Sequence, residues 1–253
     1  MTFDVAGESY GKFMGRFSEP LADQFATFTG VAAGQRALDV GCGPGALAAR
    51  LVDRLGAANV AGIDPSEPFV AAARERLPGA DVRRGTAEDL PFDDDAFDVV
   101  ASQLVVHFMR DPLAGVRDMR RVCRDGGTVA LAVWKRDGNG VGPLVPFWRG
   151  VTAAGLGTRG EADLIGTKEG QLAELCDRAG LAVQETTVLT VTAPFETFED
   201  WWRPFTFGIG PAGEFVAGLD VGTLERVRAA CAAELGPGPF EVDGDAWAVR
   251  AAV

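Results

Sequence analysis

Short buried-strand patterns alternate with amphipathic helix patterns in the first half of the chain, and this alternation limits the fold more than any other feature. The apolar run ALDV at residues 37–40 precedes a segment in which Leu47, Leu51 and Leu55 recur on one helical face. Further strands are predicted at residues 59–64, 80–84, 97–103 and 127–134, with helices at 66–77 and 112–122. Strands that alternate with helices of this length predict a parallel, doubly wound α/β sheet.

The second half of the chain has a different texture. Residues 135–166 are rich in glycine and are expected to be irregular, with a short helix near 147–154. Later elements are predicted at 168–179 (helix), 181–193 (strand), 222–235 (helix) and 246–253 (strand). Two strands joined across an aromatic helical segment indicate an antiparallel hairpin at the sheet edge. We expect one domain over 1–253, divided into a helical cover (1–34), a ligand-binding core (35–134), a Gly-rich insertion (135–166) and a helical lid (195–236).

Charge and cysteine usage narrow the possible partners. The chain has 36 acidic and 24 basic residues, a formal net charge of -12, and such a surface repels phosphate backbones and anionic lipid heads. We therefore expect no nucleic acid partner and no membrane. We expect no secretory signal, because the first residues show neither a basic nor an apolar region, and no run in the sequence approaches the 18 apolar residues of a spanning helix. One histidine and four widely spaced cysteines predict no metal site and no disulfide scaffold, which fits a reducing cytoplasm.

The first strand leads into a glycine-rich turn, LDVGCGPGAL at residues 38–47. In a doubly wound sheet the ligand binds beyond the carboxyl ends of the strands, and this turn forms its floor. Gly41, Gly43 and Gly45 permit positive φ and let a ligand approach the backbone, although a purely structural tight turn would need them too. The pattern also matches a dinucleotide fingerprint. Asp39 argues against NAD, because an NAD site usually has an apolar residue there.

A carboxylate ends the second predicted strand, at Asp64 in GIDPS. In this position it can accept hydrogen bonds from both hydroxyls of a ribose, and it repels the extra phosphate of NADP. The alternative is a turn aspartate before Pro65. Together with the glycine turn, Asp64 favours an adenosine-containing ligand.

Five motifs give the chain a family resemblance. They are LDVGCGPG (38–45), GIDPS (62–66), GTAEDLPF (85–92), FDVVASQLVVHF (97–108) and RVCRDGGTVALAVW (121–134). Over residues 9–192 the chain resembles class I S-adenosylmethionine-dependent methyltransferases of the ubiquinone/menaquinone-biosynthesis-like (methyltransferase type 11) group. The resemblance implies a seven-stranded, mostly parallel Rossmann-like sheet with an antiparallel edge strand. It also implies methyl transfer with S-adenosylmethionine as cofactor and S-adenosylhomocysteine as product.

The resemblance implies a set of cofactor-binding residues. From the glycine turn to the end of the fourth strand these are Asp39, Gly41, Cys42, Gly43, Gly45, Asp64, Pro65, Ser66, Thr86, Ala87, Glu88, Gln103 and Leu104. The turn and Asp39 would line the methionine and ribose parts, and the residues after Asp64 would flank the adenine. Thr86 stands where the family commonly has an acidic or amide residue, so Ala87 or Glu88 would contact the adenine amine here. Gln103 and Leu104 would face the methionine part and the acceptor.

The N-terminal segment YGKFMGRFS at residues 10–18 resembles the family's entry helix. In that helix Tyr10 and Arg16 would approach the cofactor carboxylate. The alternative is a packing helix that only covers the sheet.

His107 is the candidate catalytic base. It stands where many relatives carry the first of two adjacent histidines, and Phe108 occupies the second position. An ordinary imidazole pKa near 6.5 would suit proton removal at neutral pH. A histidine at a strand-to-helix turn is also a common capping or packing residue, and both roles stay open.

The predicted lid is rich in aromatic residues. With two residues of the Gly-rich stretch they are Phe147, Trp148, Phe195, Phe198, Trp201, Trp202, Phe205 and Phe207. Part of this set would form the lid core, and the rest would make a hydrophobic cleft for a small acceptor, such as an aromatic secondary metabolite or a quinone-like compound. An alternative is a cofactor-binding protein of the same fold that catalyses a rearrangement or cyclisation without methylation. The methylated atom and the choice between monomer and homodimer stay open.

Overall fold

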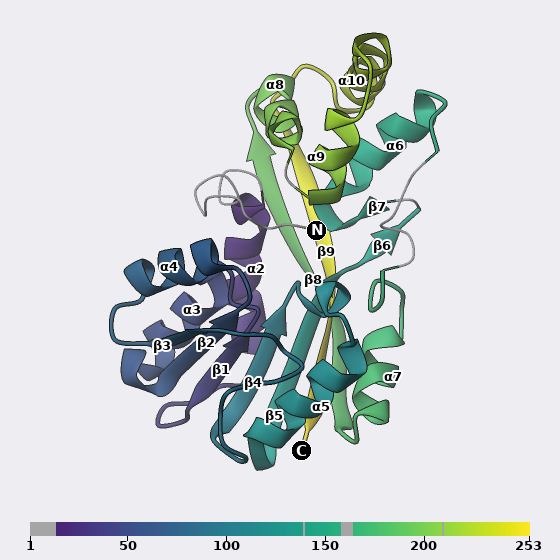
Figure 1. Cartoon of the computed structure of the whole chain (residues 1–253). Coiled ribbons are helices and arrows are strands. Elements are labelled where there is room, and N and C mark those ends of the chain that lie inside the picture. Colours follow the sequence, from purple (N-terminus) through teal and green to yellow (C-terminus); the bar gives the residue numbers. More distant parts are fainter. Residues whose placement is uncertain (1–13, 139, 158–163, 209) are drawn as a thin grey trace.

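A computed structural model describes residues 14–138, 140–157, 164–208 and 210–253. Its main sheet has seven strands in the order β3-β2-β1-β4-β5-β9-β8 (Figure 1). In chain order they are β1 (Ala37–Val40), β2 (Val60–Asp64), β3 (Asp81–Arg84), β4 (Phe97–Gln103), β5 (Cys123–Trp134), β8 (Ala182–Phe195) and β9 (Phe240–Ala252). A separate short pair is formed by β6 (Arg136–Asp137) and β7 (Gly140–Val141).

Strands β1 to β5 are parallel, whereas β9 is antiparallel to both of its neighbours, β5 and β8. The predicted Rossmann-like, mostly parallel sheet is therefore confirmed, with β9 next to the edge and β8 at it. Strand β9 begins earlier than the predicted residue 246, because it pairs with β8 as far as Phe240 opposite Phe195. Thr190 and Thr192 of β8 donate to the carboxylates of Asp245 and Asp243, which keeps these polar residues within the strand pair.

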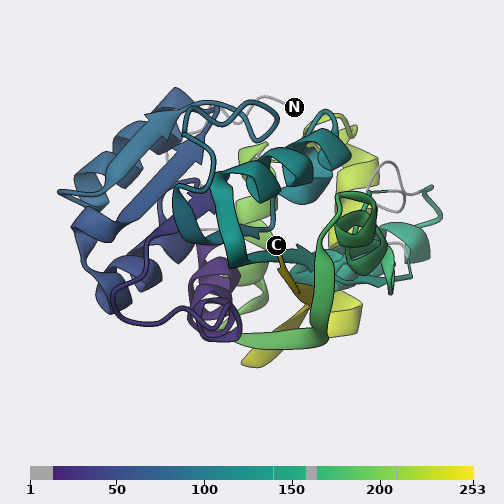
Figure 2. The same cartoon turned by 90° about the horizontal axis from the view of Figure 1, so that it is seen from below.

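Helices cover both faces of the sheet, and α2 and α5 lie on opposite sides of it (Figure 2). The helices beside the sheet are α2 (Gly15–Phe28), α3 (Ala46–Leu55), α4 (Glu67–Arg76), α5 (Pro112–Val122) and α7 (Gln171–Arg178). Short 3-10 turns are η1 (Ala57–Asn59), η2 (Val106–Phe108), η3 (Gly142–Leu144) and η4 (Arg203–Phe207). Leu47 and Leu51 of α3 pack with Phe25 of α2, as their helical spacing predicts, while Val116 and Met119 of α5 enter the core on the other face.

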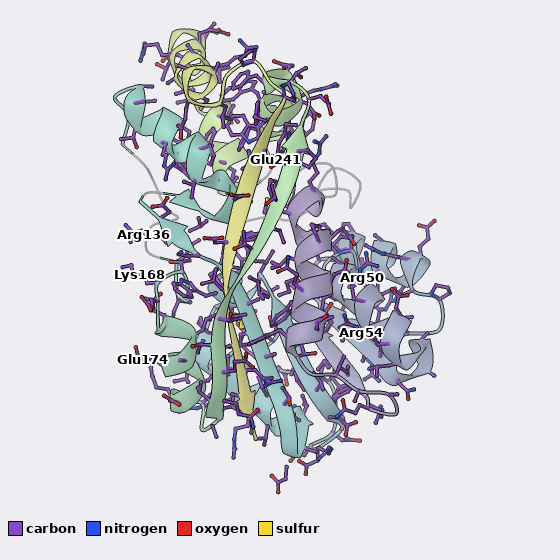
Figure 3. The ribbon with its side chains drawn as sticks, turned by 180° about the vertical axis from the view of Figure 1, so that it is seen from behind. Arg50, Arg54, Arg136, Lys168, Glu174 and Glu241 are labelled. Atoms are coloured by element: carbon purple, nitrogen blue, oxygen red, sulfur yellow. The ribbon has the colours of Figure 1, made fainter. Side chains whose placement is uncertain are left out.

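Helices α2 and α3 are also joined by polar contacts (Figure 3). Arg50 of α3 forms an ion pair with Asp23 of α2 at 3.0 Å, and Arg54 donates to the hydroxyl of Thr27 at 2.9 Å. Exposed pairs of this kind contribute at most about 1 kcal/mol each. The buried apolar faces of α2 and α3 therefore supply most of the attachment, and the ion pair and the hydrogen bond fix how the helices sit against each other.

The aromatic residues of the second half form a separate core at the far end of the β8–β9 hairpin (Figure 1). This core, which we call the aromatic unit, is built by α6 (Val145–Ala153), α8 (Phe198–Trp202), α9 (Gly210–Ala217), α10 (Val221–Leu235) and the turn η4. Phe147 stacks on Phe205 with ring centroids 4.5 Å apart, and both rings are buried. A Cβ on Gly150 would lie 2.2 Å from the Cys231 sulfur, so this glycine lets α6 and α10 pack closely.

We expect Phe147→Ala to lower the free energy of unfolding by about 3 to 5 kcal/mol, because it removes a fully buried ring from the aromatic unit. Phe207→Ala is the matched control, since Phe207 is 43% exposed, and its expected cost is below about 1 kcal/mol. Urea unfolding followed by tryptophan fluorescence measures both. Equal losses in the two variants would contradict a packed core centred on Phe147.

Candidate functional site

A cavity of about 620 Å³ lies at the carboxyl ends of β1, β2 and β4. Its volume is within the usual range for small-molecule sites. The walls come from the glycine turn after β1, the turns after β2 and β3, and the segment after β4. These four segments are far apart in sequence and meet because parallel strands end at the same edge of the sheet.

The glycine turn is packed between β2 and the segment after β4. The N–H groups of Gly41 and Cys42 both donate to the carbonyl of Ile63, at 2.7 and 2.9 Å. Gly41 has a φ of 75°, and a Cβ there would lie 2.4 Å from a methyl carbon of Val105. Only glycine meets both requirements, so Gly41 allows the turn to approach β4 this closely.

Asp64 joins the first two turns of the site. One of its carboxylate oxygens accepts the N–H of Gly43 and the other accepts the N–H of Ser66, both at 2.9 Å. The side chain is buried, and this burial raises its pKa although the two hydrogen bonds act in the opposite direction. A carboxylate oxygen can accept more than one hydrogen bond, so Asp64 keeps capacity for ligand hydroxyls while it holds the turns.

Asp39 is almost completely buried beneath the glycine turn and lines the cavity. Its carboxylate accepts the N–H of Ala48 in α3 at 2.9 Å. Burial raises the pKa of Asp39 to about 7, with the nearby Asp64 carboxylate as a smaller cause. A cationic ligand group in the cavity would favour the ionised form of this carboxylate.

The turn after β3 forms another wall, with Thr86, Ala87 and Glu88. The Glu88 carboxylate accepts the backbone N–H groups of Arg110 and Asp111, at 2.8 and 3.3 Å. It thereby links this turn to the segment that follows β4. Glu88 therefore both lines the cavity and holds two segments of its wall together.

The segment after β4 brings Gln103, Leu104 and His107 to the cavity. Leu104 has a left-handed backbone with a φ of 64°, which is uncommon for a residue with a side chain, and its N–H donates to Ala132 at 2.7 Å. The Gln103 amide nitrogen donates to the carbonyl of Ser18 in α2 at 3.0 Å. The chain turn after β4 is thus held by both β5 and α2.

His107 lies in η2, and its Nδ1 is buried without a hydrogen-bond partner in the part of the chain that is described. Burial lowers its pKa to about 4. The sequence-based assumption of an ordinary pKa near 6.5 is therefore wrong, because the surrounding protein disfavours the charged ring. At physiological pH the imidazole is neutral.

The residues around this cavity lie in a region that is similar in sequence to known proteins. Residues 38–131 match the family model described as "Methyltransferase domain". Over these residues the chain therefore matches a methyltransferase domain. A probable phthiotriol/phenolphthiotriol dimycocerosates methyltransferase of Mycobacterium ulcerans is 40% identical over 39% of each chain. A 2-methyl-6-phytyl-1,4-hydroquinone methyltransferase of Oryza sativa is 35% identical over 45% of this chain and 31% of its own. The chain thus spans about two fifths or less of these relatives.

Solved structures resemble the methyltransferase domain over a longer stretch. A protein of Bacillus halodurans described as a putative methyltransferase aligns with 91% of this chain and 97% of its own, with a TM-score of 0.59 and 16% identity. The [4+2]-cyclase SpnF aligns with 92% of this chain and 80% of its own, with a TM-score of 0.59 and 23% identity. These likenesses support the fold.

The methyltransferase domain gathers nearly all of the predicted cofactor residues around the cavity. Those that line it are Asp39, Gly41, Cys42, Gly43, Asp64, Pro65, Ser66, Thr86, Ala87, Glu88, Gln103 and Leu104, together with His107. Gly45 does not line it, because it starts α3 with a φ of 90° and faces Leu77. Tyr10 lies outside the described residues.

Arg16 is not brought to the cavity. Its guanidinium forms a bidentate pair with Asp200 of α8, at 2.8 and 3.0 Å, and lies 4.8 Å from the centroid of the Phe195 ring. The predicted approach to the cofactor carboxylate is therefore not what the structure shows, since the aromatic unit supplies a carboxylate for this cation. Arg16 instead connects α2 to the aromatic unit.

The aromatic unit does not form a wall of the cavity. Among the described residues the rings pack against one another where the cleft is predicted, and Phe195, Trp201 and Phe205 border a void of about 10 Å³. Leu104 both lines the cavity and packs in the aromatic unit. The structure therefore has a packed aromatic core where the sequence predicts an acceptor cleft, because the aromatic side chains bury one another.

Sequence reasoning missed several residues of the cavity. They include Ser18 of α2, Phe69 of α4, Val105, and the rim residues Phe108, Met109 and Arg110. The rim residues follow His107 directly, so a longer reading of the segment after β4 would have found them. Nothing in the sequence pairs Ser18 with Gln103, since these residues meet only through the packing of α2.

We expect Gly41→Ala to lower the free energy of unfolding by about 2 to 5 kcal/mol, because it combines a positive φ with a clash against Val105. Gly43→Ala is the control, with a positive φ but no atom within 4 Å, and its expected cost is about 1 to 2 kcal/mol. The Gly41→Ala/Val105→Ala double variant should recover part of the difference. Chemical denaturation measures all three, and a clash is excluded if the double variant is no better than the sum of its parts.

His107 should make the stability depend on pH. Its pKa is 6.5 in an unfolded chain and about 4 in the fold, so between these values the unfolded state binds more protons. The neutral ring contributes fully to the free energy of unfolding above about pH 6.5. This contribution is lost as the pH falls toward 4, by at most about 1.4 kcal/mol for each pH unit. Unfolding of the wild type and of His107→Gln between pH 4 and 7 checks this. A constant difference between the two would show that His107 titrates normally.

Proposed function

We propose that this chain binds S-adenosylmethionine in the cavity at the carboxyl edge of the sheet and transfers its methyl group to a small-molecule acceptor. The main support for this proposal is that the glycine turn, Asp64 and Asp39 line the same cavity within a methyltransferase domain. Each of these groups suits one part of the cofactor.

The residues present fit the cofactor. Asp64 would hold the ribose hydroxyls, and the buried Asp39 would favour the cationic amino-acid end. Thr86, Ala87 and Glu88 would border the adenine, and Pro65 and Ser66 would flank it. When bound, S-adenosylmethionine supplies an electrophilic methyl group on a positively charged sulfur. The protein's part is to align the acceptor and to exclude water, which can supply most of the rate.

The acceptor we propose is a hydrophobic or aromatic small molecule. Leu104, Phe108 and Met109 give the cavity an apolar side next to His107. The two curated relatives above are named for methyl transfer to phthiotriol/phenolphthiotriol dimycocerosates and to 2-methyl-6-phytyl-1,4-hydroquinone. The net charge of -12 opposes a nucleic acid acceptor. None of the described helices combines the length and the apolar composition that a membrane crossing requires.

The proposal also includes a role for His107 as proton acceptor and a cellular compartment that agrees with the cysteines. His107 would take the proton released by the acceptor, since its ring is neutral and faces the cavity. All four cysteines are free and buried, which supports a reducing compartment such as the cytoplasm.

A second candidate function is a rearrangement or cyclisation in which bound cofactor only orders the cavity. The likeness to the [4+2]-cyclase SpnF favours it, since that structure has the same fold and a different named reaction. Cofactor binding is expected in both cases, so only methyl transfer separates them.

We expect Asp64→Asn to weaken S-adenosylhomocysteine binding at least tenfold, because the amide has one acceptor oxygen where two backbone N–H groups and a ribose must be served. Asp177→Asn is the control, since Asp177 is exposed on α7, and its affinity should stay within twofold of the wild type. Calorimetric titration measures the affinities, and thermal melting checks that both variants fold.

The same protein is then incubated with methyl-labelled S-adenosylmethionine and a set of hydroquinones, phenols and amines. Label in one of these products supports methyl transfer. Tight cofactor binding without label in any product favours the second function, and a wild type that binds no S-adenosylhomocysteine excludes both.

A further inference from the structure

Asp39 is a buried carboxylate beside the cavity, and its hydrogen bonding in the described part of the chain does not neutralise a charge. It is 1% exposed and lines the cavity from beneath the glycine turn. Its Oδ2 accepts the backbone N–H of Ala48 at 2.9 Å. Removing an isolated charge from water is costly, so a buried carboxylate either pairs with a cation or takes up a proton.

The strands and turns around Asp39 supply no such cation among the described residues. In the sheet, Asp39 lies between Gly62 of β2 and Ala101 of β4, neither of which has a titratable side chain. The glycine turn adds the Cys42 thiol, which stays neutral because burial raises its pKa. The end of β2 adds Asp64, which is a second carboxylate near Asp39.

The neighbouring helices do not neutralise Asp39 either. Helix α3 presents the N–H of Ala48, whereas its Arg50 forms ion pairs with carboxylates of α2. Arg110 is the only Lys or Arg that lines the cavity in the described part of the chain. It is exposed, and its backbone N–H is bonded to Glu88 on the wall formed by the turn after β3. Positive charge beside Asp39 must therefore come from a ligand.

These surroundings determine the charge of Asp39 in the free protein. Burial raises its pKa to about 7, with the Asp64 carboxylate as a smaller cause, so much of the free protein carries a proton on Asp39 at neutral pH. A positive charge in the cavity lowers the pKa of a carboxylate through the low-dielectric interior, even without direct contact. A cationic ligand that binds here therefore drives off the proton.

We propose that a cationic cofactor binds this cavity in exchange for the Asp39 proton, so that its affinity rises with pH up to neutrality. The inference rests on the proposed function, since S-adenosylmethionine carries positive charges on its sulfur and on its amino group. It adds a regulatory property to the same site, because acidification releases the cofactor. 5′-Methylthioadenosine has the same adenosine part without either charge, and it leaves the proton on Asp39.

The test counts the protons released when each ligand binds. S-adenosylmethionine and 5′-methylthioadenosine are titrated by calorimetry into the whole chain at pH 6.5, in buffers with different ionisation enthalpies. The dependence of the heat on the buffer gives the number of protons released. We expect at least about half a proton for S-adenosylmethionine and about none for 5′-methylthioadenosine. Equal release by the two ligands, or none with S-adenosylmethionine, would overturn the proposal without any variant.

The affinity should show the same coupling. From pH 5.5 to 6.5 the wild type should bind S-adenosylmethionine about threefold to tenfold more tightly, because one released proton changes the affinity by at most about tenfold for each pH unit. The rise should level off above about pH 7, where the free protein has already lost the Asp39 proton. An affinity that falls as the pH rises would contradict this coupling.

Asp39→Asn separates Asp39 from Asp64 as the source of the proton. Asparagine is neutral and of similar shape, and its oxygen can still accept the N–H of Ala48, so it imitates protonated Asp39. The proton release and the rise with pH should both be lost, while the affinity for 5′-methylthioadenosine stays within threefold. Asp177→Asn, which changes an exposed carboxylate of α7, is the control and should release as many protons as the wild type. Release that persists in Asp39→Asn assigns the proton to another group and overturns the proposal.

These outcomes separate the inference from the function on which it rests. A wild type that binds neither ligand rejects the proposed function itself. A wild type that binds both ligands with the same proton release rejects only the role of Asp39.

Discussion

The close approach of the glycine turn to the end of β4 is the constraint on which the site depends. Gly41 lies against Val105 with no room for a side chain, and its N–H is bound to β2 through Ile63. Asp64, the last residue of β2, adds a second hydrogen bond between β2 and the glycine turn by accepting the Gly43 N–H. Any side chain at Gly41 would push the glycine turn away from Val105, so this close packing sets the distance between the floor of the cavity and the wall formed by the segment after β4.

Three successive positions of α2 tie the cavity to the aromatic unit. Arg16 pairs with Asp200, Phe17 packs among the aromatic rings, and the Ser18 carbonyl orients the Gln103 amide. The aromatic unit therefore contributes to the site through α2 and Leu104, although its rings do not line the cavity. Its tightly stacked rings form a rigid support for α2 and Leu104, and rigid support of this kind is what holds binding groups in a productive geometry.

Much of the fold and of the cofactor half of the site could be predicted from the sequence. The strands and helices between residues 37 and 134 carry regular periodicities and clear breaks, and the motifs lie at strand ends, where a parallel sheet must bring them together. The role of Arg16 could not be predicted, because its partner Asp200 is distant in sequence. The full extent of β9 was hidden as well, because Asp243 and Asp245 interrupt its apolar pattern and are satisfied only by threonines of β8.

Local periodicity and strand polarity are properties of the amino-acid sequence, so the class of fold can be inferred from it. The same holds for the meeting of the glycine turn, Asp64 and the residues after β3 and β4 at one edge of the sheet. Two other properties arise from the packing of distant segments: the aromatic residues fill a core of their own, and the His107 ring stays neutral. The packing around Gln103 also leaves its Oε1 buried and without a hydrogen-bond partner among the described residues. Burial, pKa and hydrogen-bond satisfaction depend on which distant segments surround a side chain, and no spacing along the chain records them.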